Sequence, residues 1–445
     1  MPLIETPPEE VQDYFPPSLR EKYVLAGKIE QLKLSKHATP AQIGWEPNWD
    51  DFQQRSEQLQ AKNADKSEKN VPSGWPRHLP SHLAWRGEDL NQESAYVYEI
   101  SGSDKEEIIR ALAICKDRHL TLGDINRSTF HLPSLHAKLE AISKDIHSGF
   151  GFFVVRGWQS AEFSQADNAI VFVGISSYIA EKRGRQNQRG MMLTHITDIA
   201  PIVTSEVKLR SAYSNVKQPF HSDLMCGVLA LFCQSPAAEG GETRLASSWN
   251  IYNELAASRP DIIHVLQNDN WVHDTHGRDP PYHYRPLLHL NENSKPILIF
   301  SRRVLTGSRE TPRTAGIPPL SEEQAEALDA LHLIASKHCI EIKQQAGDML
   351  FVNNFAILHS RKSFTDSEVA KRYFMRLWLY NEEQSWTLPE SLQLPWDRIF
   401  APLHNVRDYW DADPFKTVVD PAANLPGPPP PPPPPPPVVY STSCG

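Results

Sequence analysis

Apolar residues in the first half of the chain follow strand-like and helix-like spacings in turn. Residues 95–100 alternate as a half-buried strand does, and residues 105–118 and 135–149 repeat apolar side chains at helical spacing. Gly149 is suited to end the second helix. The short apolar run of residues 151–157 is typical of a buried strand. The pattern therefore predicts a strand, two helices and a second strand, in this order.

Strand-like segments dominate the second half. Residues 219–245 form a strand-rich block, and residues 247–260 and 320–336 have helical patterns, the first with Ser247 or Ser248 as its N-cap. Further strands are predicted over three segments, residues 296–305, 347–360 and 371–381. Strands separated by long insertions, with helices outside them, predict an α+β fold. Its core would be a double-stranded β-helix, or jelly roll, decorated by helices.

The two ends of the chain differ from this middle part. Residues 1–85 are polar and interrupted by prolines, with one helical stretch near Trp49–Lys66, so we expect an extension wrapped on a main body at 86–413. Residues 414–445 form a proline-rich tail, expected to be disordered, with ten consecutive prolines at 428–437. Such a run forms an extended polyproline II rod, either a stiff spacer or a docking ligand for an SH3 or WW domain.

Composition narrows the function classes. The chain has 445 residues, a net charge of −9 and a pI near 6.1, which favours neither nucleic acid nor an anionic membrane as a partner. The N-terminus does not resemble a secretory signal, and no apolar run is long enough to cross a bilayer. Five cysteines without a CxxC pair argue against disulfides and thiolate zinc sites. A cytoplasmic location is therefore expected.

One His-x-Asp triplet suggests a metal site. His221 and Asp223 flank Ser222 at the start of an apolar strand, and no other His-x-Asp or His-x-Glu triplet occurs in the chain. Residues two apart on a strand share a face, so both side chains could bind one cation. His359 follows the strand-like run 347–358 and is the candidate third ligand. An imidazole pair and a carboxylate suit a facial triad for iron(II), although zinc or nickel would also bind.

Two arginines lie in phase near the end of the predicted core. Arg372 and Arg376 are four residues apart, so on a strand they share one face with Phe374 and Trp378. Burying two guanidinium groups without anions would cost several kcal/mol. Either a carboxylate-bearing cosubstrate or internal Asp and Glu partners must therefore be present.

Residues 219–255, 347–364 and 371–386 together resemble the taurine dioxygenase (TauD/TfdA) family of clavaminate synthase-like enzymes. The shared pattern combines His-x-Asp, a downstream Gly-Gly-x-Thr, a distal Asn-x-x-x-x-His and a late Arg-x-x-x-Arg. The resemblance is clearest over 145–400 and begins near residue 85. It implies that residues 86–413 form a jelly-roll oxygenase domain.

The resemblance also implies cofactors and residue roles. Fe(II) would be held by His221, Asp223 and His359, and the distal carboxylate of 2-oxoglutarate would meet Arg372 and the hydroxyl of Thr243. Arg376 matches a position that faces the substrate's anionic group in some members and serves the cosubstrate in others.

With dioxygen, an enzyme of this kind would hydroxylate a small, anionic organic molecule and release succinate and CO2. Desaturation or ring closure with the same cofactors is an alternative outcome. A catalytically silent jelly roll that acts as a scaffold through its polyproline tail is an alternative of another class.

Other histidines have structural interpretations. His273, His276, His283 and His289 form a second histidine-rich stretch, which we interpret as a loop over the pocket mouth rather than a second metal site. His195 is interpreted as a surface or core histidine.

Overall fold

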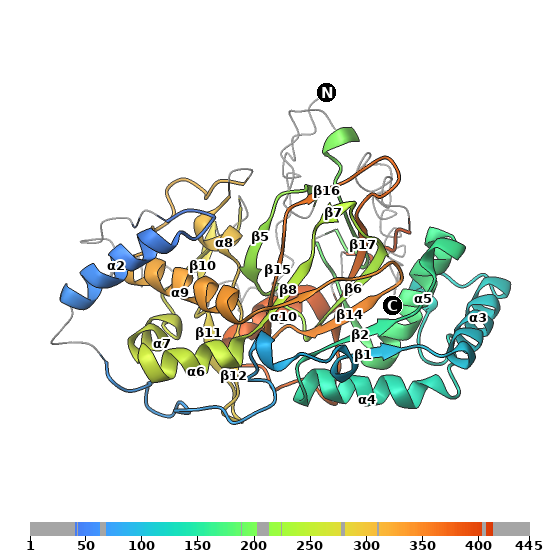
Figure 1. The fold of residues 1–445 in the computed structure, drawn as a ribbon, viewed down its shortest axis with the longest axis horizontal. Helices are drawn as coiled ribbons and strands as arrows, with labels where there is room; N and C mark the ends of the chain where they lie inside the picture. Colours follow the sequence, from blue (N-terminus) through green and yellow to red (C-terminus); the bar gives the residue numbers. More distant parts are fainter. Residues whose placement is uncertain are drawn as a thin grey trace, which may run out of the picture.

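The computed structural model describes residues 41, 43–62, 68–187, 189–202, 213–223, 225–276, 281–308, 311–402 and 406–412. Within them, two sheets stand at the centre and helices lie on both sides (Figure 1). This mixture of helices and largely antiparallel sheets agrees with the predicted mixed class. The predicted tail at 414–445, with its polyproline run, lies outside the described residues.

The larger sheet has seven strands in the order β1-β2-β14-β6-β17-β3, with β4 also paired to β17. Only β1 and β2 pair in parallel; the other pairs are antiparallel. The strands are β1 (Val97–Glu99), β2 (Phe152–Arg156), β3 (Lys182–Gly184), β4 (Thr194–Thr197), β6 (Val228–Ser235), β14 (Met349–Asn353) and β17 (Tyr373–Tyr380).

Three helices cover the outer face of this sheet: α3 (Gly102–Asp117), α4 (Leu135–Ser148) and α5 (Gln165–Ile179). Side chains of the central strands alternate between two cores. In β6, Ala230 and Phe232 pack with these helices, whereas Leu229 and Leu231 belong to the core on the inner face. The larger sheet thus has buried side chains on both faces, which explains its nearly continuous apolar sequence.

The smaller sheet is antiparallel, in the order β13-β8-β15-β5. Its strands are β5 (Gln218–His221), β8 (Thr243–Ser247), β13 (Ile340–Ile342) and β15 (Ile357–Arg361). A helical layer lies beside it, formed by α2 (Trp49–Lys62), α6 (Ser248–Ser258), α7 (Pro260–Leu266) and α9 (Glu322–His338). Ser247 is the N-cap of α6, because its side chain accepts a hydrogen bond from Asn250 N–H.

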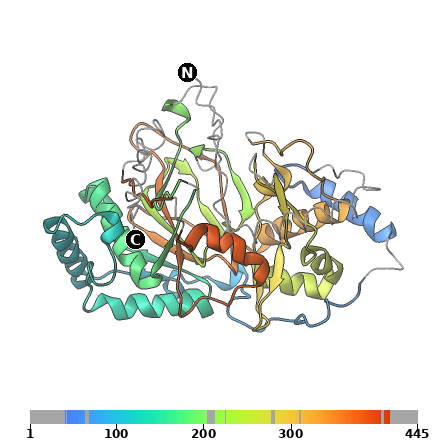
Figure 2. The same ribbon diagram turned by 180° about the vertical axis from the view of Figure 1, so that it is seen from behind.

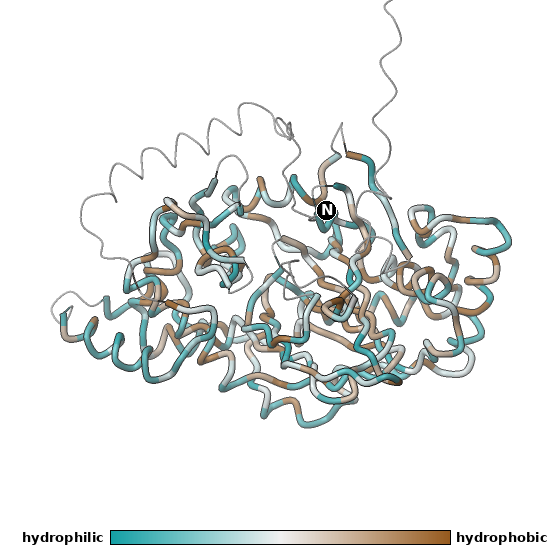
Figure 3. The backbone as a smooth tube through the Cα atoms, turned by 90° about the horizontal axis from the view of Figure 1, so that it is seen from above, coloured by the Kyte–Doolittle hydropathy of each residue, from teal (hydrophilic) through white to brown (hydrophobic). Residues whose placement is uncertain are grey.

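Helix α2 is the described helix of the predicted N-terminal extension. Arg55 on α2 bonds Glu322 and Asp329 of α9 at 2.8 and 2.9 Å. Figure 3 shows α2 at the left edge of the molecule with hydrophilic colour along it, whereas apolar colour gathers in the interior. Arg55 therefore attaches a largely polar helix to the outside of the smaller sheet's helical layer.

The remaining elements lie around these two sheets. Figure 2 shows α10 (Gln393–Phe400), in red, on the side opposite to that of Figure 1. Short helix α8 (Arg302–Thr306) and three two-stranded sheets complete the described fold, formed by β7 (Glu239–Gly240) with β16 (Phe364–Thr365), β9 (Val272–Asp274) with β10 (Tyr282–Tyr284), and β11 (Leu288–Leu290) with β12 (Pro296–Leu298). Among the described residues, no helix is long and apolar enough to span a bilayer.

Two predicted strands are wrong in detail. Residues 296–305 contain β12 but continue into helix α8, because Arg302 is buried and bonds Asp329 at 2.9 Å. Residues 347–360 form two strands, β14 and β15, which belong to different sheets and are joined by a turn. Apolar runs alone do not show where a chain passes from one sheet to the other.

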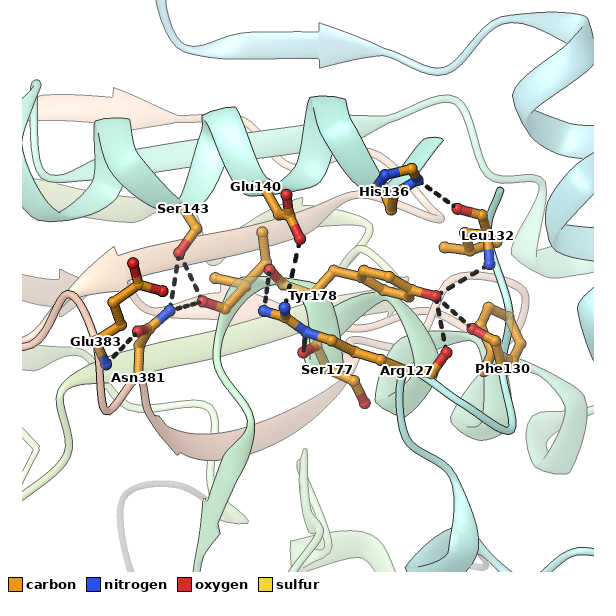
Figure 4. Close-up of polar contacts among 11 residues, drawn as sticks. Arg127, Phe130, Leu132, His136, Glu140, Ser143, Ser177, Tyr178, Asn381 and Glu383 are labelled. Carbon is orange, nitrogen blue, oxygen red and sulfur yellow. Dashed lines mark hydrogen bonds and ion pairs between the residues drawn. The ribbon is translucent and has the colours of Figure 1, made fainter. Parts of the chain in front are cut away.

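Side chains from three segments close the C-terminal end of α5 (Figure 4). Arg127 Nε donates to the Ser177 carbonyl at 2.9 Å. Ser143 Oγ and Asn381 Nδ2 donate to the Ile179 carbonyl at 2.6 and 2.9 Å. These bonds satisfy carbonyl groups that have no partner within a helix end. They also join α5 to α4 and to the segment that follows β17.

Tyr178→Phe should lower the free energy of unfolding by about 1–3 kcal/mol, because it leaves a buried N–H group without a partner. The Tyr178 hydroxyl accepts from Leu132 N–H at 3.0 Å and lies 2.9 Å from the Phe130 carbonyl (Figure 4). Urea denaturation followed by circular dichroism measures the difference. An unchanged midpoint and slope would show that water replaces the lost bond.

Candidate metal centre

His221 and His359 lie opposite each other on neighbouring antiparallel strands. His221 is the last residue of β5, the edge strand of the smaller sheet, and His359 is in the middle of β15. Their ring centroids are 4.2 Å apart. His359 is thus within a strand rather than after one, and strand pairing alone brings the two imidazoles together.

Asp223 is held by a side chain from the turn between β14 and β15. Strand β5 ends at His221, so Asp223 lies beyond it and not on the strand as the triplet spacing suggested. Asn354 Oδ1 accepts from Asp223 N–H at 2.8 Å, and Asn354 Nδ2 donates to the carbonyls of Asp223 and Cys226, each at 3.2 Å. Asn354 therefore fixes the backbone that presents the carboxylate.

The three side chains form a compact donor set. One ligand atom from each of His221, Asp223 and His359 lies within 4.8 Å of the other two, and His359 Nε2 is 3.9 Å from Asp223 Oδ1. Among the described residues, this is the one group of histidine, cysteine and acidic side chains able to hold an ion. His221 Nδ1 is 2.8 Å from the Pro219 carbonyl, which can only accept, so Nδ1 carries the proton and Nε2 is left to bind metal.

Electrostatics keep the donors in the protonation states that a metal needs. Burial lowers the pKa of His359 to about 3 and also lowers that of His221, so both imidazoles are neutral at pH 7. Burial alone would raise the pKa of the Asp223 carboxyl, but the positive charge of Arg376 and the hydrogen bond from Trp378 counteract it and the pKa is lowered. Two neutral imidazoles and one carboxylate are a donor set that fits iron(II).

Two residues of β17 contact the Asp223 carboxylate. Trp378 Nε1 donates to Oδ2 at 2.5 Å, and Arg376 Nη1 lies 3.1 Å from the same oxygen. Arg376 and Trp378 are two apart on the strand and point to the same side, as the alternation predicted. Arg376 thus has an internal acidic partner, one of the two alternatives for a buried arginine in this strand.

Trp378→Phe should weaken Fe(II) binding by about 10- to 100-fold, because it removes the hydrogen bond that orients the Asp223 carboxylate while it keeps an aromatic ring. Anaerobic competition with a chromophoric chelator measures the dissociation constant. Trp158→Phe is the matched control. Trp158 lies in the core between the larger sheet and its covering helices, and its Nε1 donates to Asn168 at 2.8 Å. If both variants weaken Fe(II) binding equally, Trp378 acts through packing rather than through its hydrogen bond to Asp223.

A cavity between the two sheets adjoins the triad. It contains about 480 Å³ of space not filled by atoms, part of it open to solvent, and its wall includes His221, Thr243, His359, Arg372 and Arg376. The structure therefore brings these predicted site residues to one cavity. The remaining wall residues are Ile196, Gln218, Leu229, Leu231, Ser360, Arg361 and Phe374.

Arg372 is the most unusual side chain of this cavity. It is 4% exposed, and its Nη1 atom has no hydrogen-bond partner among the described residues. Burial lowers its pKa to about 10, so the guanidinium is still charged at pH 7. The hydroxyl of Thr243 donates to Gln344 Oε1 at 2.9 Å. A buried cation with an unsatisfied N–H group is suited to bind an anionic ligand.

Several residues that shape this centre were not predicted from the sequence. Arg361 lies two positions after His359 on β15, which puts it on the same side of the strand, and this spacing could have identified it. Asn354 belongs to the Asn-x-x-x-x-His pattern but had no predicted role. Gln186, which bonds Arg376 Nε at 2.7 Å, gave no local signal, because its partner is 190 positions away.

His195 and the histidine-rich stretch lie apart from the triad's donor set. His195 is buried in the larger sheet, 2.8 Å from the Tyr373 hydroxyl, which fits the core interpretation. His273 and His283 stack with ring centroids 5.2 Å apart in the β9–β10 pair. They are therefore part of a small sheet rather than of an irregular loop.

Comparison with known proteins identifies the family of the chain. The model of the family described as taurine catabolism dioxygenase TauD, TfdA family, matches residues 116–378, more than half of the chain. The chain belongs to the TauD/TfdA family. The predicted family is therefore confirmed, and the matched region includes the predicted triad, Arg372 and Arg376.

Two curated relatives match most of this chain. A taurine hydroxylase-like protein of Stachybotrys chartarum is 35% identical over 349 residues, 77% of this chain and 90% of the relative. FR-33289 synthase of Streptomyces rubellomurinus is 26% identical over 321 residues, 69% of this chain and 91% of the relative.

A solved structure shares the fold. Asparagine oxygenase in complex with Fe(II), 3-hydroxyasparagine and succinate has a TM-score of 0.50 at 15% identity, covering 64% of this chain and 93% of that one. Membership of the TauD/TfdA family makes this protein a 2-oxoglutarate-dependent non-haem iron dioxygenase that uses Fe(II), 2-oxoglutarate and dioxygen.

Proposed function

We propose that His221, Asp223 and His359 are the iron ligands of this dioxygenase. The single observation that carries this assignment is the donor set itself, with all three ligand atoms within 4.8 Å of one another. A facial triad of this kind leaves three coordination positions open, enough for a bidentate cosubstrate and dioxygen. Burial keeps both imidazoles neutral, so each has a nitrogen lone pair available to the metal.

Arg372 and Thr243 bind the distal carboxylate of 2-oxoglutarate in this proposal. They line the same cavity as the two histidines. The Nη1 atom of Arg372, which has no hydrogen-bond partner among the described residues, could donate a hydrogen bond to the carboxylate. Thr243 lies on β8 directly opposite Arg361 of β15, and its hydroxyl can turn from Gln344 toward a carboxylate oxygen. Arg376, which faces Asp223, adds a second positive charge beside the cosubstrate.

The reaction proposed is hydroxylation of a small, anionic organic molecule, with release of succinate and CO2. When bound, iron and 2-oxoglutarate supply the activated oxygen, and the chain supplies orientation and a cationic cavity. Arg361, Arg372 and Arg376 line that cavity, which favours anions. The relative named taurine hydroxylase-like supports hydroxylation as the type of reaction.

The two central sheets support the finer fold and domain assignments. Their facing arrangement, with the cavity between them, is the one expected of a double-stranded β-helix, or jelly roll. We place its domain at 86–413, after an extension at 1–85 and before a proline-rich tail at 414–445. Arg55 on α2 is one of the contacts that attach this extension to α9.

Anaerobic addition of Fe(II) and then 2-oxoglutarate to metal-free protein tests the proposal. A weak visible charge-transfer band should develop with one equivalent of each and disappear when a chelator removes the iron. Oxygen should then yield succinate, measured enzymatically, faster when a suitable sulfonate or carboxylate substrate is present. Protein that retains no iron and forms no band would contradict the proposed site.

A further inference from the structure

A glutamine outside the donor set fixes the position of Arg376. Gln186 follows β3 and is buried. Its Oε1 accepts from Arg376 Nε at 2.7 Å, and its Nε2 donates to the backbone carbonyls of Arg376 and Met192 at 2.6 and 2.9 Å. Gln186 thereby binds the guanidinium at Nε, and Nη1 remains directed at the Asp223 carboxylate. Because the amide is neutral, it does not cancel the charge of Arg376.

The loop that carries Gln186 is in turn held by the end of the described chain. We name residues 406–412 the C-terminal strap. Tyr409 N–H donates to the Gly190 carbonyl at 2.9 Å, and Met192 N–H donates to the Tyr409 carbonyl at 3.0 Å. Asp408 pairs with Arg185 at 2.7 Å, next to Gln186. Backbone bonds and one ion pair thus attach the strap to both sides of the Gln186 loop.

Gly190 makes this close approach possible. Its φ is +89°, a conformation that residues with a side chain rarely adopt, and a Cβ atom there would lie 2.3 Å from the Arg407 carbonyl oxygen. Any larger residue must push the strap away. Gly316 has a similar φ of +83° but open space around it, so the two glycines differ in whether a Cβ would meet the strap.

We infer that Gln186 is a positioning residue for Arg376, and that the C-terminal strap completes the active site by holding the Gln186 loop. The inference rests on the proposed role of Arg376 in the cosubstrate cavity. Contacts run continuously from strap to loop, from Gln186 to Arg376, and from Arg376 to Asp223. Residues far along the chain from the predicted motifs thus belong to the site.

Two variants of the full-length chain test the inference, Gly190→Ala and Gln186→Leu, with Gly316→Ala as the matched control. The first readout is the dissociation constant of 2-oxoglutarate at saturating Fe(II) without oxygen. Gln186→Leu and Gly190→Ala should each raise it about 2- to 13-fold, the range for the net contribution of one typical hydrogen bond. Gly316→Ala should leave the dissociation constant unchanged. It introduces the same backbone strain as Gly190→Ala but no contact with the strap.

Two further readouts separate the steps. Hydrogen exchange of peptides from 189–195 and 406–412 should speed up in Gly190→Ala but not in Gln186→Leu. In metal-free protein, the NMR signal of the Arg376 Nε–H, assigned by its loss in Arg376→Lys, should be protected in wild type and lose that protection in both variants. This last readout does not depend on iron.

The outcomes are distinct. If the Arg376 Nε–H stays protected in Gln186→Leu, the positioning role of Gln186 is wrong. The same conclusion follows if the dissociation constant of 2-oxoglutarate is unchanged in both variants. Faster exchange of the strap in Gly190→Ala without any change at Arg376 overturns the role of the strap. If wild type forms no charge-transfer band but the Nε–H responds as expected, the proposed function fails while the positioning of Arg376 by Gln186 stands.

Discussion

His221→Ala is expected to abolish stoichiometric iron binding and to lower turnover by at least about a thousandfold. A metal's stabilisation of a reaction is worth several kcal/mol, and about 4 kcal/mol corresponds to three powers of ten. The variant removes one of three donors at the edge of the smaller sheet, where no neighbouring side chain replaces it among the described residues. Iron content after desalting and succinate release measure the two effects.

The fold should survive this substitution. His221 ends an edge strand, and its one described hydrogen bond goes to the Pro219 carbonyl, so the loss in stability should be about 1 kcal/mol. His264→Ala is the control, because His264 likewise bonds only a backbone carbonyl, that of Asn70. Full iron content in His221→Ala would show that the triad is not the metal site, whereas equal losses in both variants would point to damage of the fold.

Local spacing predicted the face of β17 well. Alternation placed Arg372 and Arg376 on one side with Phe374 and Trp378, and the structure has all four on the inner side of the larger sheet. A strand fixes side-chain direction through its period of two, so a sequence with a well-defined strand predicts which side chains lie together. The same reasoning was less accurate for Asp223, because β5 ends before it.

Long-range contacts account for what the sequence did not predict. Helix α5 is buried on nearly every side between α3, α4 and the larger sheet, so its sequence is apolar all round and lacks the helical spacing of a half-exposed helix. Gln186 and Asn354 act through hydrogen bonds to Arg376 and Asp223, 190 and 131 positions away. Such contacts follow from the sheet topology, which no local pattern contains.

Arg372→Met should weaken 2-oxoglutarate binding by about 10- to 150-fold, as expected for a charge-assisted bond worth about 1.5–3 kcal/mol. The same substitution should raise the free energy of unfolding of the metal-free protein by about 1–2 kcal/mol, because it removes a buried charge whose Nη1 atom has no partner. Contacts of the guanidinium with Phe374, at 4.0 Å, offset part of that gain. Charge-transfer titration and urea denaturation measure the two changes.

Arg361→Met is the comparison that gives this prediction its sharpest test. Arg361 lines the same cavity, but its Nη2 atom donates to the carbonyls of Ser214 and Val216 and so holds the segment before β5. Its loss should therefore lower the stability of the metal-free protein, opposite in sign to Arg372→Met. Opposite signs would show that Arg372 is retained for its ligand rather than for the fold. If both variants are destabilised and only Arg361→Met loses affinity for 2-oxoglutarate, the cosubstrate carboxylate belongs to Arg361, and the role that the family resemblance implied for Arg372 is wrong.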